Sequence, residues 1–314
     1  DSKNEVLAIS LDAKDLRLTK RWVGDFPLLG RSVWDRYRPE GLFDLTGTVN
    51  YSWGRAGERD YSLIFTAKDS SCKYLAFPVA NATGRIFIDP HSVIVNNLKG
   101  ELFKGAVEGF SLVNLEAPFT YFNRYAFTDV DMAEFLKDLN TGKTQLEGKA
   151  TGVVSFQGDH SLGNFEGEGN LSIPDARLWK FPIILQIISK LQLKLWAVEG
   201  PPQNCTFDFS LNEDGITFKE ISLASDVLDI YGQGWSSYKG ELKLVFYARP
   251  VSKTPILVAD LIVQKALDSI SGNLAQFEVR GTFSNPTITI IPLTPVGKNI
   301  SNFFDALTRQ RLGR

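Results

Sequence analysis

The sequence contains few of the residues that most often carry chemistry. Its 314 residues include two cysteines, two histidines and one methionine. Cys72 and Cys205 are too few for a disulfide framework. They either pair in an oxidising compartment or, as we favour, are two small buried side chains. His91 and His160 each lie in a turn-like segment near one Asp, which favours exposed loop positions over metal binding or catalysis.

A long apolar segment and an excess of charge of one sign are also absent. The longest apolar run, 182–188, is far shorter than the roughly 20 residues that span a bilayer, so we expect no transmembrane span. The first residues are strand-like, without a charged n-region and apolar h-region, so no signal peptide is visible. The start without Met suggests a processed or excised fragment. Lysine and arginine number 34 against 36 aspartate and glutamate, which argues against nucleic acid as a partner.

No group of residues has the pattern of a catalytic or phosphate-binding site. Asp159, His160 and Ser161 are triad residue types, but consecutive residues cannot face one another in triad geometry. The G-x-G pairs that begin at Gly167 and Gly232 lie between predicted strands, which indicates bulges or close sheet packing rather than a phosphate loop. We therefore expect no enzymatic activity, no cofactor and no metal site.

Apolar and polar residues alternate through most of the chain. The segments 43–53 and 277–283 have apolar residues or glycine at odd positions, as in strands with one buried face. Glycine and proline residues separate these alternating runs from one another. Together the two patterns predict strands at 7–18, 43–53, 62–67, 84–89, 92–100, 102–112, 146–158, 165–173, 207–211, 216–223, 228–235, 240–248 and 277–291. The predicted fold class is mainly β with a few short amphipathic helices, in which a long, twisted antiparallel sheet curls into an apolar groove.

Helical spacing of apolar residues predicts helices within 22–41 and over 130–140, 181–191 and 255–271. Thr128 or Asp129 is the expected N-cap of the second helix, and Thr254 that of the fourth. Residues 293–314 form a tail. No linker interrupts the pattern, so we expect one continuous unit over 1–314, with approximate modules at 1–120, 121–195 and 196–292.

The order of these segments resembles that of a known family. Segments 169–191, 207–235, 240–250 and 277–292, the last containing the motif GTFSNP, are similar to the carboxy-terminal region of AsmA-like proteins. Segments 33–49 and 77–112 are similar to modules of the larger AsmA-like proteins of bacteria. The resemblance implies a periplasmic protein, tethered to the inner membrane by a segment absent from this chain. It also implies a curved sheet that conducts phospholipids between the inner and outer membranes.

An apolar groove would act without catalytic residues. It would remove the cost of exposing a lipid tail to water, about 0.8 kcal/mol per CH₂. We therefore expect non-enzymatic lipid binding or transfer, with a phospholipid or another acyl-chain lipid as the partner. The candidate lining residues are Phe43, Leu45, Val49, Tyr51, Ile86, Ile88, Phe207, Phe209, Leu242, Leu244, Phe246, Phe277, Val279 and Phe283. The alternative is that the same side chains fill the closed β core of a structural or assembly protein of the envelope.

The tail and the tryptophans suggest two further roles. The tail combines apolar and basic residues, so it could dock on a membrane, on envelope proteins or on another copy of the chain; a packed terminus is the alternative. The docking candidates are Phe303, Phe304, Leu307, Arg309 and Arg311. A carbohydrate-active or hydrolytic β-protein is a third, weaker hypothesis, since most tryptophans are better explained as core or groove-rim residues. The tryptophans concerned are Trp53, Trp179, Trp196 and Trp235.

Overall fold

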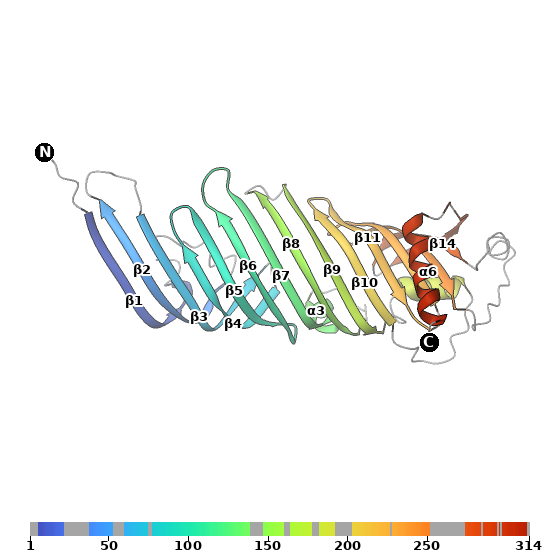
Figure 1. The fold of residues 1–314 in the computed structure, drawn as a ribbon, viewed down its shortest axis with the longest axis horizontal. Coiled ribbons are helices and arrows are strands. Elements are labelled where there is room, and N and C mark those ends of the chain that lie inside the picture. The colour runs from blue at the N-terminus through green and yellow to red at the C-terminus, as the bar shows by residue number, and fades with distance from the viewer. Residues whose placement is uncertain are drawn as a thin grey trace. The chain divides into compact units, whose positions relative to one another are not determined.

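Strands dominate the structure, a computed structural model that describes most of the chain (Figure 1). The described residues are 6–21, 38–52, 60–74, 77–138, 147–159, 164–177, 182–191, 203–226, 228–251, 274–283, 285–293, 295 and 297–312.

Fifteen strands form one sheet, in which the order of the strands is their order along the chain. All neighbouring pairs with a defined register are antiparallel. This confirms the predicted fold class of a mainly β protein built on an antiparallel sheet. The strands are β1 (Val6–Leu18), β2 (Glu40–Ser52), β3 (Asp60–Tyr74), β4 (Phe77–Ile88), β5 (Ser92–Leu102), β6 (Gly105–Asn114), β7 (Thr120–Asp131), β8 (Lys149–Asp159), β9 (Phe165–Ala176), β10 (Gln203–Asn212), β11 (Gly215–Ala224), β12 (Leu228–Ser236), β13 (Glu241–Pro250), β14 (Ala275–Thr282) and β15 (Pro286–Ile291).

Segment 102–112, predicted as one strand, instead contains the turn of the hairpin that joins β5 to β6. Strand β5 ends before Phe103 and β6 begins after Lys104, and these two residues have φ values of 47° and 61°. Two successive positive φ values are typical of a type I′ turn, which glycine, asparagine or aspartate usually supplies. The prediction was wrong here because neither turn residue is of these types.

Helix α3 (Met132–Asp138) begins later than predicted. The Oδ1 atom of Asp131 accepts hydrogen bonds from the backbone N–H groups of residues 133 and 134, at 2.9 and 3.2 Å. Asp131 is therefore the N-cap. The predicted caps, Thr128 and Asp129, both lie within β7.

The other predicted helices have mixed outcomes. Helix α4 (Pro182–Lys190) confirms the helix predicted over 181–191, with proline at its first position. The tail contains α6 (Lys298–Leu312). The helix predicted over 255–271 lies outside the described residues. Of the helix predicted within 22–41, residues 22–37 also lie outside the described residues, and residues 40 and 41 belong to β2.

Aspartate and asparagine residues interrupt several strands without changing which face is apolar. Asp15, Asn81 and Asn97 have φ values of 54°, 50° and 52°, and each lies where the register of its strand shifts. Short Asp and Asn side chains tolerate this left-handed conformation. Each forms a β-bulge, which bends and twists the strand. Because a bulge adds one residue, the apolar side chains on both sides of it stay on the same face.

The chain forms two compact units. Unit 1 comprises 1–130 and 153–166, and unit 2 comprises 131–152 and 167–314. Unit 1 contains a buried cluster around Leu63 and Phe65 and a second one around Val107 and Tyr125.

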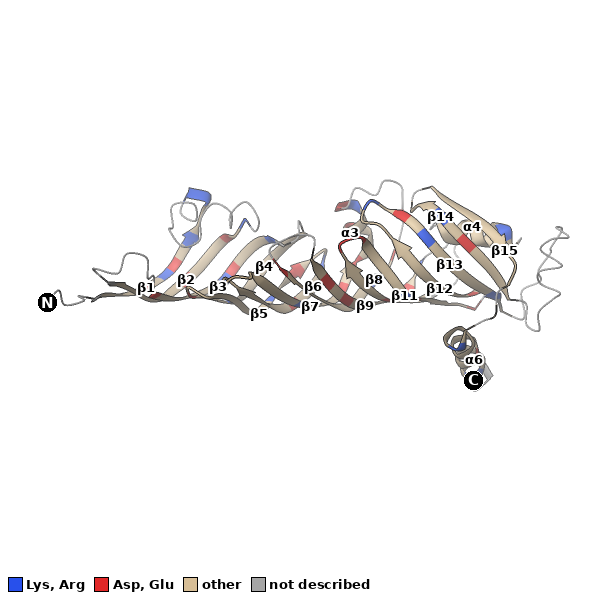
Figure 2. Cartoon of the chain, turned by 90° about the horizontal axis from the view of Figure 1, so that it is seen from above, with Lys and Arg blue, Asp and Glu red and all other residues tan. Residues whose placement is uncertain are grey.

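Among the described residues of unit 2, helices α4 and α6 pack on the sheet. Helix α6 packs on β12, where Phe304 joins a buried cluster with Tyr231 and Tyr247. Helix α4 contacts β15, and Gln186 Nε2 donates a 2.8 Å hydrogen bond to the carbonyl of Pro286. Figure 2 shows α4 and α6 on opposite sides of this part of the sheet.

Candidate functional site

One face of β1–β7 in unit 1 carries no charged side chain at any position paired in register. We call this face the inner face of unit 1. Its members are identified from the register, because alternate residues of a strand share a face and residues paired across neighbouring strands point to the same side. Its polar groups include Ser111 and Tyr125, whose hydroxyls lie 2.5 Å apart. Members of the inner face include Leu7, Ile9, Leu11, Phe43, Leu45, Val49, Tyr51, Tyr61, Leu63, Phe65, Ile86, Ile88, Val93, Val95, Val113, Tyr121 and Tyr125.

Exposure on the inner face rises toward one end. At its centre, the exposed fractions of Leu63 and Phe65 are 0% and 2%. Where β1 begins and β2 ends, Leu7, Ile9 and Tyr51 are 45%, 44% and 55% exposed. Leu7 pairs directly with Tyr51 in the register. Apolar surface is thus continuous from a buried centre to a solvent-accessible end.

Six of the predicted lining residues lie on the inner face of unit 1. Their exposure differs: Phe43, Leu45 and Ile88 are buried, Val49 and Ile86 half-buried, and Tyr51 exposed. The exposed end also contains Leu7 and Ile9, which are absent from the predicted set. The alternation of apolar residues in β1 is the sequence signal that marks them.

Seven more predicted residues share one face of unit 2, which we call the inner face of unit 2. Phe207 and Phe209 are half-buried there, and the ring centroids of Phe207 and Phe218 are 6.3 Å apart. The remaining five are at most 4% exposed, so they form a packed interior: Leu242, Leu244, Phe246, Phe277 and Val279. Phe283 is an exception, since β14 ends at Thr282 and Phe283 lies half-buried in the following turn.

The G-x-G pair at 232–234 lies within β12, not between strands as expected, and serves close packing. A Cβ atom at Gly232 would lie 2.3 Å from two ring atoms of Phe246. The ring of Phe246 therefore lies directly on the backbone of the neighbouring strand, and only glycine leaves room for it. This supports the structural interpretation of these glycines.

The opposite face of unit 1 has an apolar patch of its own. Five side chains in register cross from β3 to β7, and Phe110 extends the row by its ring contact with Phe122, at 5.6 Å between centroids. Phe110 and Leu112 are 39% and 42% exposed. We call this the outer patch of unit 1; it consists of Ile64, Phe87, Ile94, Phe110, Leu112 and Phe122.

The packing of α6 buries some of the predicted docking residues of the tail and leaves others exposed. Phe304 is 5% exposed, and the ring of Phe303 lies 5.5 Å from that of Tyr231. These two aromatic residues hold α6 against its own sheet, as in the alternative of a packed terminus, instead of presenting apolar surface to a partner. Leu307 is half-buried, Arg309 is exposed, and residue 311 lies in the last turn of α6.

A buried carboxylate reinforces the attachment of α6. Asp229 is 0% exposed, and Arg249 Nη2 lies 3.3 Å from its Oδ2 atom. The same Nη2 atom donates a 3.0 Å hydrogen bond to the carbonyl of Phe304, and the guanidinium lies 4.7 Å from the centroid of that ring. Arg249 thus links the helix to β12 and β13.

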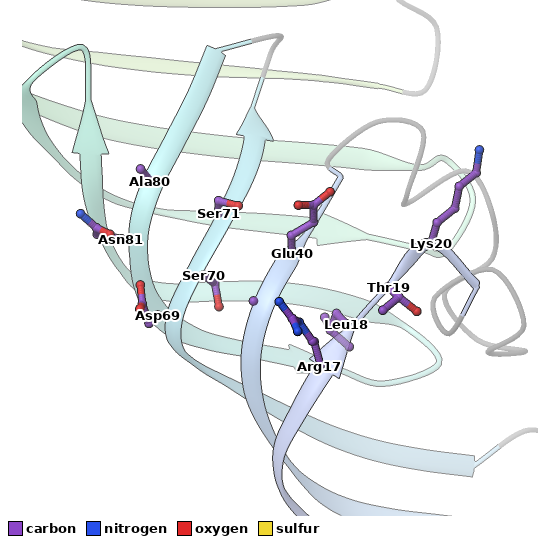
Figure 3. Close-up of a pocket in the computed structure, with 11 residues that line it drawn as sticks. Arg17, Leu18, Thr19, Lys20, Glu40, Asp69, Ser70, Ser71, Ala80 and Asn81 are labelled. Carbon is purple, nitrogen blue, oxygen red and sulfur yellow. The ribbon is translucent and has the colours of Figure 1, made fainter.

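A polar pocket of about 540 Å³ adjoins the apolar core of unit 1 at the end of β1 (Figure 3). Leu18 lines the pocket and also belongs to the buried cluster around Leu63. Gly41, with φ of 120°, lets β2 and β3 approach closely, since a Cβ there would lie 2.5 Å from a carbonyl oxygen. The lining residues are Arg17, Leu18, Thr19, Lys20, Glu40, Gly41, Asp69, Ser70, Ser71, Ala80 and Asn81.

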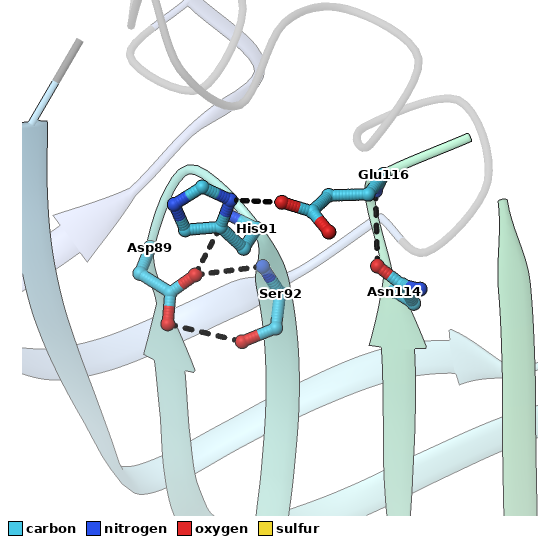
Figure 4. A network of polar contacts seen from close by, with 5 residues as sticks. All are labelled: Asp89, His91, Ser92, Asn114 and Glu116. Carbon is cyan, nitrogen blue, oxygen red and sulfur yellow. Dashed lines mark hydrogen bonds and ion pairs between the residues drawn. The ribbon is translucent and has the colours of Figure 1, made fainter. Parts of the chain in front are cut away.

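His91 lies in an exposed turn, as predicted, and takes part in a polar network (Figure 4). Its Nδ1 atom lies 2.6 Å from Glu116 Oε1. Asp89 accepts hydrogen bonds from the backbone N–H groups of His91 and Ser92, at 2.8 and 2.7 Å. Partial burial raises the pKa of Asp89, but these hydrogen bonds outweigh it and leave the pKa below its usual range. The contacts are those of a closed turn. His160 lies outside the described residues.

Both cysteines are free, and their locations favour inert thiols. Cys205 is buried, and burial raises its pKa to about 12. Cys72 is half-buried, and burial raises its pKa as well. The interpretation of two small buried side chains thus holds for Cys205, whereas Cys72 is only half-buried, and the two do not form a disulfide.

The described part of the chain contains neither a group of three or more metal-ligating side chains nor a helix long and apolar enough to cross a membrane. Of the four tryptophans in the carbohydrate hypothesis, the described residues include Trp235 alone; it is half-buried, with Lys243 Nζ 5.3 Å from its ring centroid. No family model, curated protein or solved structure matches the chain.

Proposed function

We propose that this chain is a non-enzymatic lipid-binding or lipid-transfer module, whose inner face in unit 1 accepts acyl chains. The observation that carries the proposal is an uncharged face that runs from a buried centre to the exposed Leu7, Ile9 and Tyr51. Soluble proteins rarely leave apolar side chains exposed together unless that surface binds something.

The physical chemistry of acyl chains supports this choice of ligand. Moving one CH₂ group out of water is worth about 0.8 kcal/mol, so a surface needs apolar contact and no catalytic group to bind a lipid tail. Charged side chains would oppose binding because their desolvation is costly. The paired positions of the inner face contain none.

We further propose a place for this activity in the bacterial cell envelope. The resemblance of the sequence to AsmA-like proteins supports a periplasmic module that holds or conducts phospholipids between inner and outer membranes, tethered to the inner membrane by a segment outside this chain. A phospholipid is then the natural ligand.

The test is photo-crosslinking with a phospholipid that carries a photoactivatable group on its acyl chain. We expect cross-links at the exposed end of the inner face, and lipid in organic extracts of the purified chain analysed by mass spectrometry. Ile9→Lys should reduce both signals, because it places a charge on the apolar face. Ser10→Lys is the matched control, since Ser10 is exposed on the other face of the same strand. Absence of both lipid and cross-links from the wild-type chain would refute the proposal.

The outer patch of unit 1 favours a second candidate, an assembly role for a structural protein of the envelope. Phe110 and Leu112 are exposed on a face that a monomer would be expected to keep polar. Sedimentation velocity over a range of concentrations tests this candidate. Leu112→Asp should lower the sedimentation coefficient at high concentration, and Ala106→Asp, at an exposed position of the same strand, should not. A wild-type chain that stays monomeric would exclude self-assembly through the patch.

A further inference from the structure

The exposed apolar side chains of unit 1 gather at one end of its strands, which we call the apolar end of unit 1. Because neighbouring strands are antiparallel, β1, β3, β5 and β7 begin at this end and β2, β4 and β6 finish there. Figure 1 shows the start of β1 and the end of β2 on the upper side of the sheet. Among the described residues of unit 1, every exposed large apolar side chain except Leu42 lies at this end. These side chains are Leu7, Ile9, Tyr51, Phe110, Leu112 and Phe119.

The exposed side chains of the apolar end lie on both faces of the sheet. Leu7 and Tyr51 belong to the inner face, Leu112 belongs to the outer patch, and Phe119 lies in the turn between β6 and β7. Five strand spacings separate β1 from β6, a distance of about 24 Å, so these groups form a line instead of one compact patch. A protein that covers one face of a sheet reaches only part of such a line. A planar interface into which the strand ends insert reaches all of it.

Charged groups are sparse at the apolar end. Within the described residues, its turns and the terminal three residues of its strands contain neither lysine nor arginine. Their titratable acids and histidine are Asp60, Asp89, His91 and Glu116. The opposite ends of the strands carry charges of both signs, such as Arg17, Glu40 and Lys104. Unit 1 is therefore amphipathic along its strand direction, and a surface of this kind binds a membrane interface through its apolar area.

The few charged groups of the apolar end have partners at that end. Asn50 Nδ2 donates a 2.7 Å hydrogen bond to Asp60 Oδ2. His91 Nδ1 lies 2.6 Å from Glu116 Oε1, and Asp89 accepts a 2.8 Å hydrogen bond from the backbone N–H of His91 (Figure 4). A hydrogen-bonded carboxylate costs less to move out of water than an isolated one does. These groups therefore oppose insertion only weakly.

We propose that the apolar end of unit 1 inserts into the headgroup–acyl boundary of a lipid bilayer, so that the inner face opens toward the lipid tails. This inference rests on the proposed lipid-binding function and adds the surface from which lipid enters. Interfacial segments bury about 5–10 Å into this boundary. Leu7, Tyr51 and Leu112 lie within two residues of their strand ends, which is about 7 Å or less along a strand. Insertion to that depth buries these side chains together with Phe119.

The experiment is flotation of the full chain with phosphatidylcholine vesicles over a range of lipid concentrations. We expect binding that high salt does not weaken and that added phosphatidylglycerol does not strengthen, since the described part of this end carries no lysine or arginine. Leu7→Ser and Leu112→Ser should each lower the partition about fivefold, the effect of burying half of a leucine side chain. The matched control is Leu42→Ser, because Leu42 is 40% exposed at the opposite end of the strands. Thermal unfolding of each variant checks that the fold is intact.

A fluorescent label reports whether this end enters the bilayer. A polarity-sensitive dye is attached through Ala117→Cys, in the turn after β6, or through Ala80→Cys, near the opposite end of β4, each in a Cys72→Ser background. Both alanines are exposed. Vesicles with brominated acyl chains should quench the dye at position 117 and leave the dye at position 80 unquenched.

Four results would overturn the membrane contact. They are no binding to phosphatidylcholine vesicles, equal loss of binding in Leu7→Ser and Leu42→Ser, an unquenched dye at position 117, and binding that requires phosphatidylglycerol and disappears in high salt. The lipid-binding function is judged separately, by the acyl-chain cross-links and the extracted lipid. Cross-links without vesicle binding would refute the membrane contact alone, and vesicle binding with quenching but without cross-links or extracted lipid would refute the lipid-binding function alone.

Discussion

The attachment of α6 leads to a quantitative prediction for Arg249→Met. This substitution keeps an apolar stem but removes the contact of the Arg249 guanidinium with the fully buried carboxylate of Asp229. Removing one partner of a buried ion pair typically costs 3–5 kcal/mol. Arg249 is 22% exposed, so we expect a value at the lower end, about 3 kcal/mol.

Two smaller contacts of Arg249 change this estimate little. The guanidinium lies 4.7 Å from the centroid of Phe304, an interaction worth about 0.5–1 kcal/mol at a partly exposed site. The carbonyl of Phe304 keeps a donor, because the hydroxyl of Thr308 also hydrogen-bonds to it at 2.9 Å. The destabilisation by Arg249→Met therefore comes mainly from the lost contact with Asp229, and its total should be about 3–4 kcal/mol.

The assay must report on unit 2 alone, since a protein with two units need not unfold in one step. Cys205 is 2% exposed in β10, so its labelling in urea, in a Cys72→Ser background, follows the unfolding of unit 2. A double-mutant cycle with Asp229→Asn isolates the pair, and the double variant should be at least about 1 kcal/mol more stable than the sum of the single effects predicts. Trypsin cleavage after Arg309 detects local release of the helix.

Three results would refute this reasoning. The first is a destabilisation by Arg249→Met of less than about 1 kcal/mol, the size expected of an ordinary surface ion pair. The second is a coupling energy near zero between Arg249 and Asp229. The third is unchanged protease resistance of α6 in the variant.

Three other predictions concern packing, a buried thiol and acid stability. Gly232→Ala should destabilise the chain by about 1–3 kcal/mol in urea unfolding, because the new Cβ would lie 2.3 Å from the ring of Phe246; wild-type stability would show that this ring moves freely. With its pKa raised to about 12 by burial, Cys205 should react with a thiol reagent at pH 8 only after denaturation, and rapid labelling of the folded chain would contradict its burial. The hydrogen bond from Lys68 lowers the pKa of Asp44 in the folded chain. The stabilisation from this pair is therefore fully present above the pKa that Asp44 has in the unfolded chain, and it is lost as the pH falls through the lower pKa of the folded chain. Asp44→Asn should therefore flatten the acid side of the curve of melting temperature against pH, and an unchanged curve would count against this linkage.

Much of the fold can be predicted from local patterns. The strands around Phe43, Leu45 and Val49 and those around Leu242 and Leu244 follow the period-2 alternation of apolar residues. Helix α4 follows from apolar spacing after a proline. The turn at Phe103 and Lys104 could not be predicted, because it is imposed on residue types that rarely adopt positive φ.

The candidate site is predictable only in part. Alternation identifies the face on which Tyr51 or Phe277 lies, but the two residues are 55% and 0% exposed. That difference depends on what packs over each strand, which involves contacts between segments distant in the chain. The charges of the pocket come from three strands whose hairpins bring residues 17, 40 and 69 together, and their proximity cannot be inferred from spacing alone.

The sequence by itself determined which side chains share a face, because side-chain direction in a strand alternates with a period of two residues. It also encoded the bulges: in β1, alternation runs through Leu11 and Ala13, skips at Asp15 and resumes at Leu16. Only the tertiary structure decided how much of each face stays accessible and that Phe304 packs on its own sheet. Alternation is a property of the local backbone, whereas burial depends on long-range packing between segments that the chain brings together only when it folds.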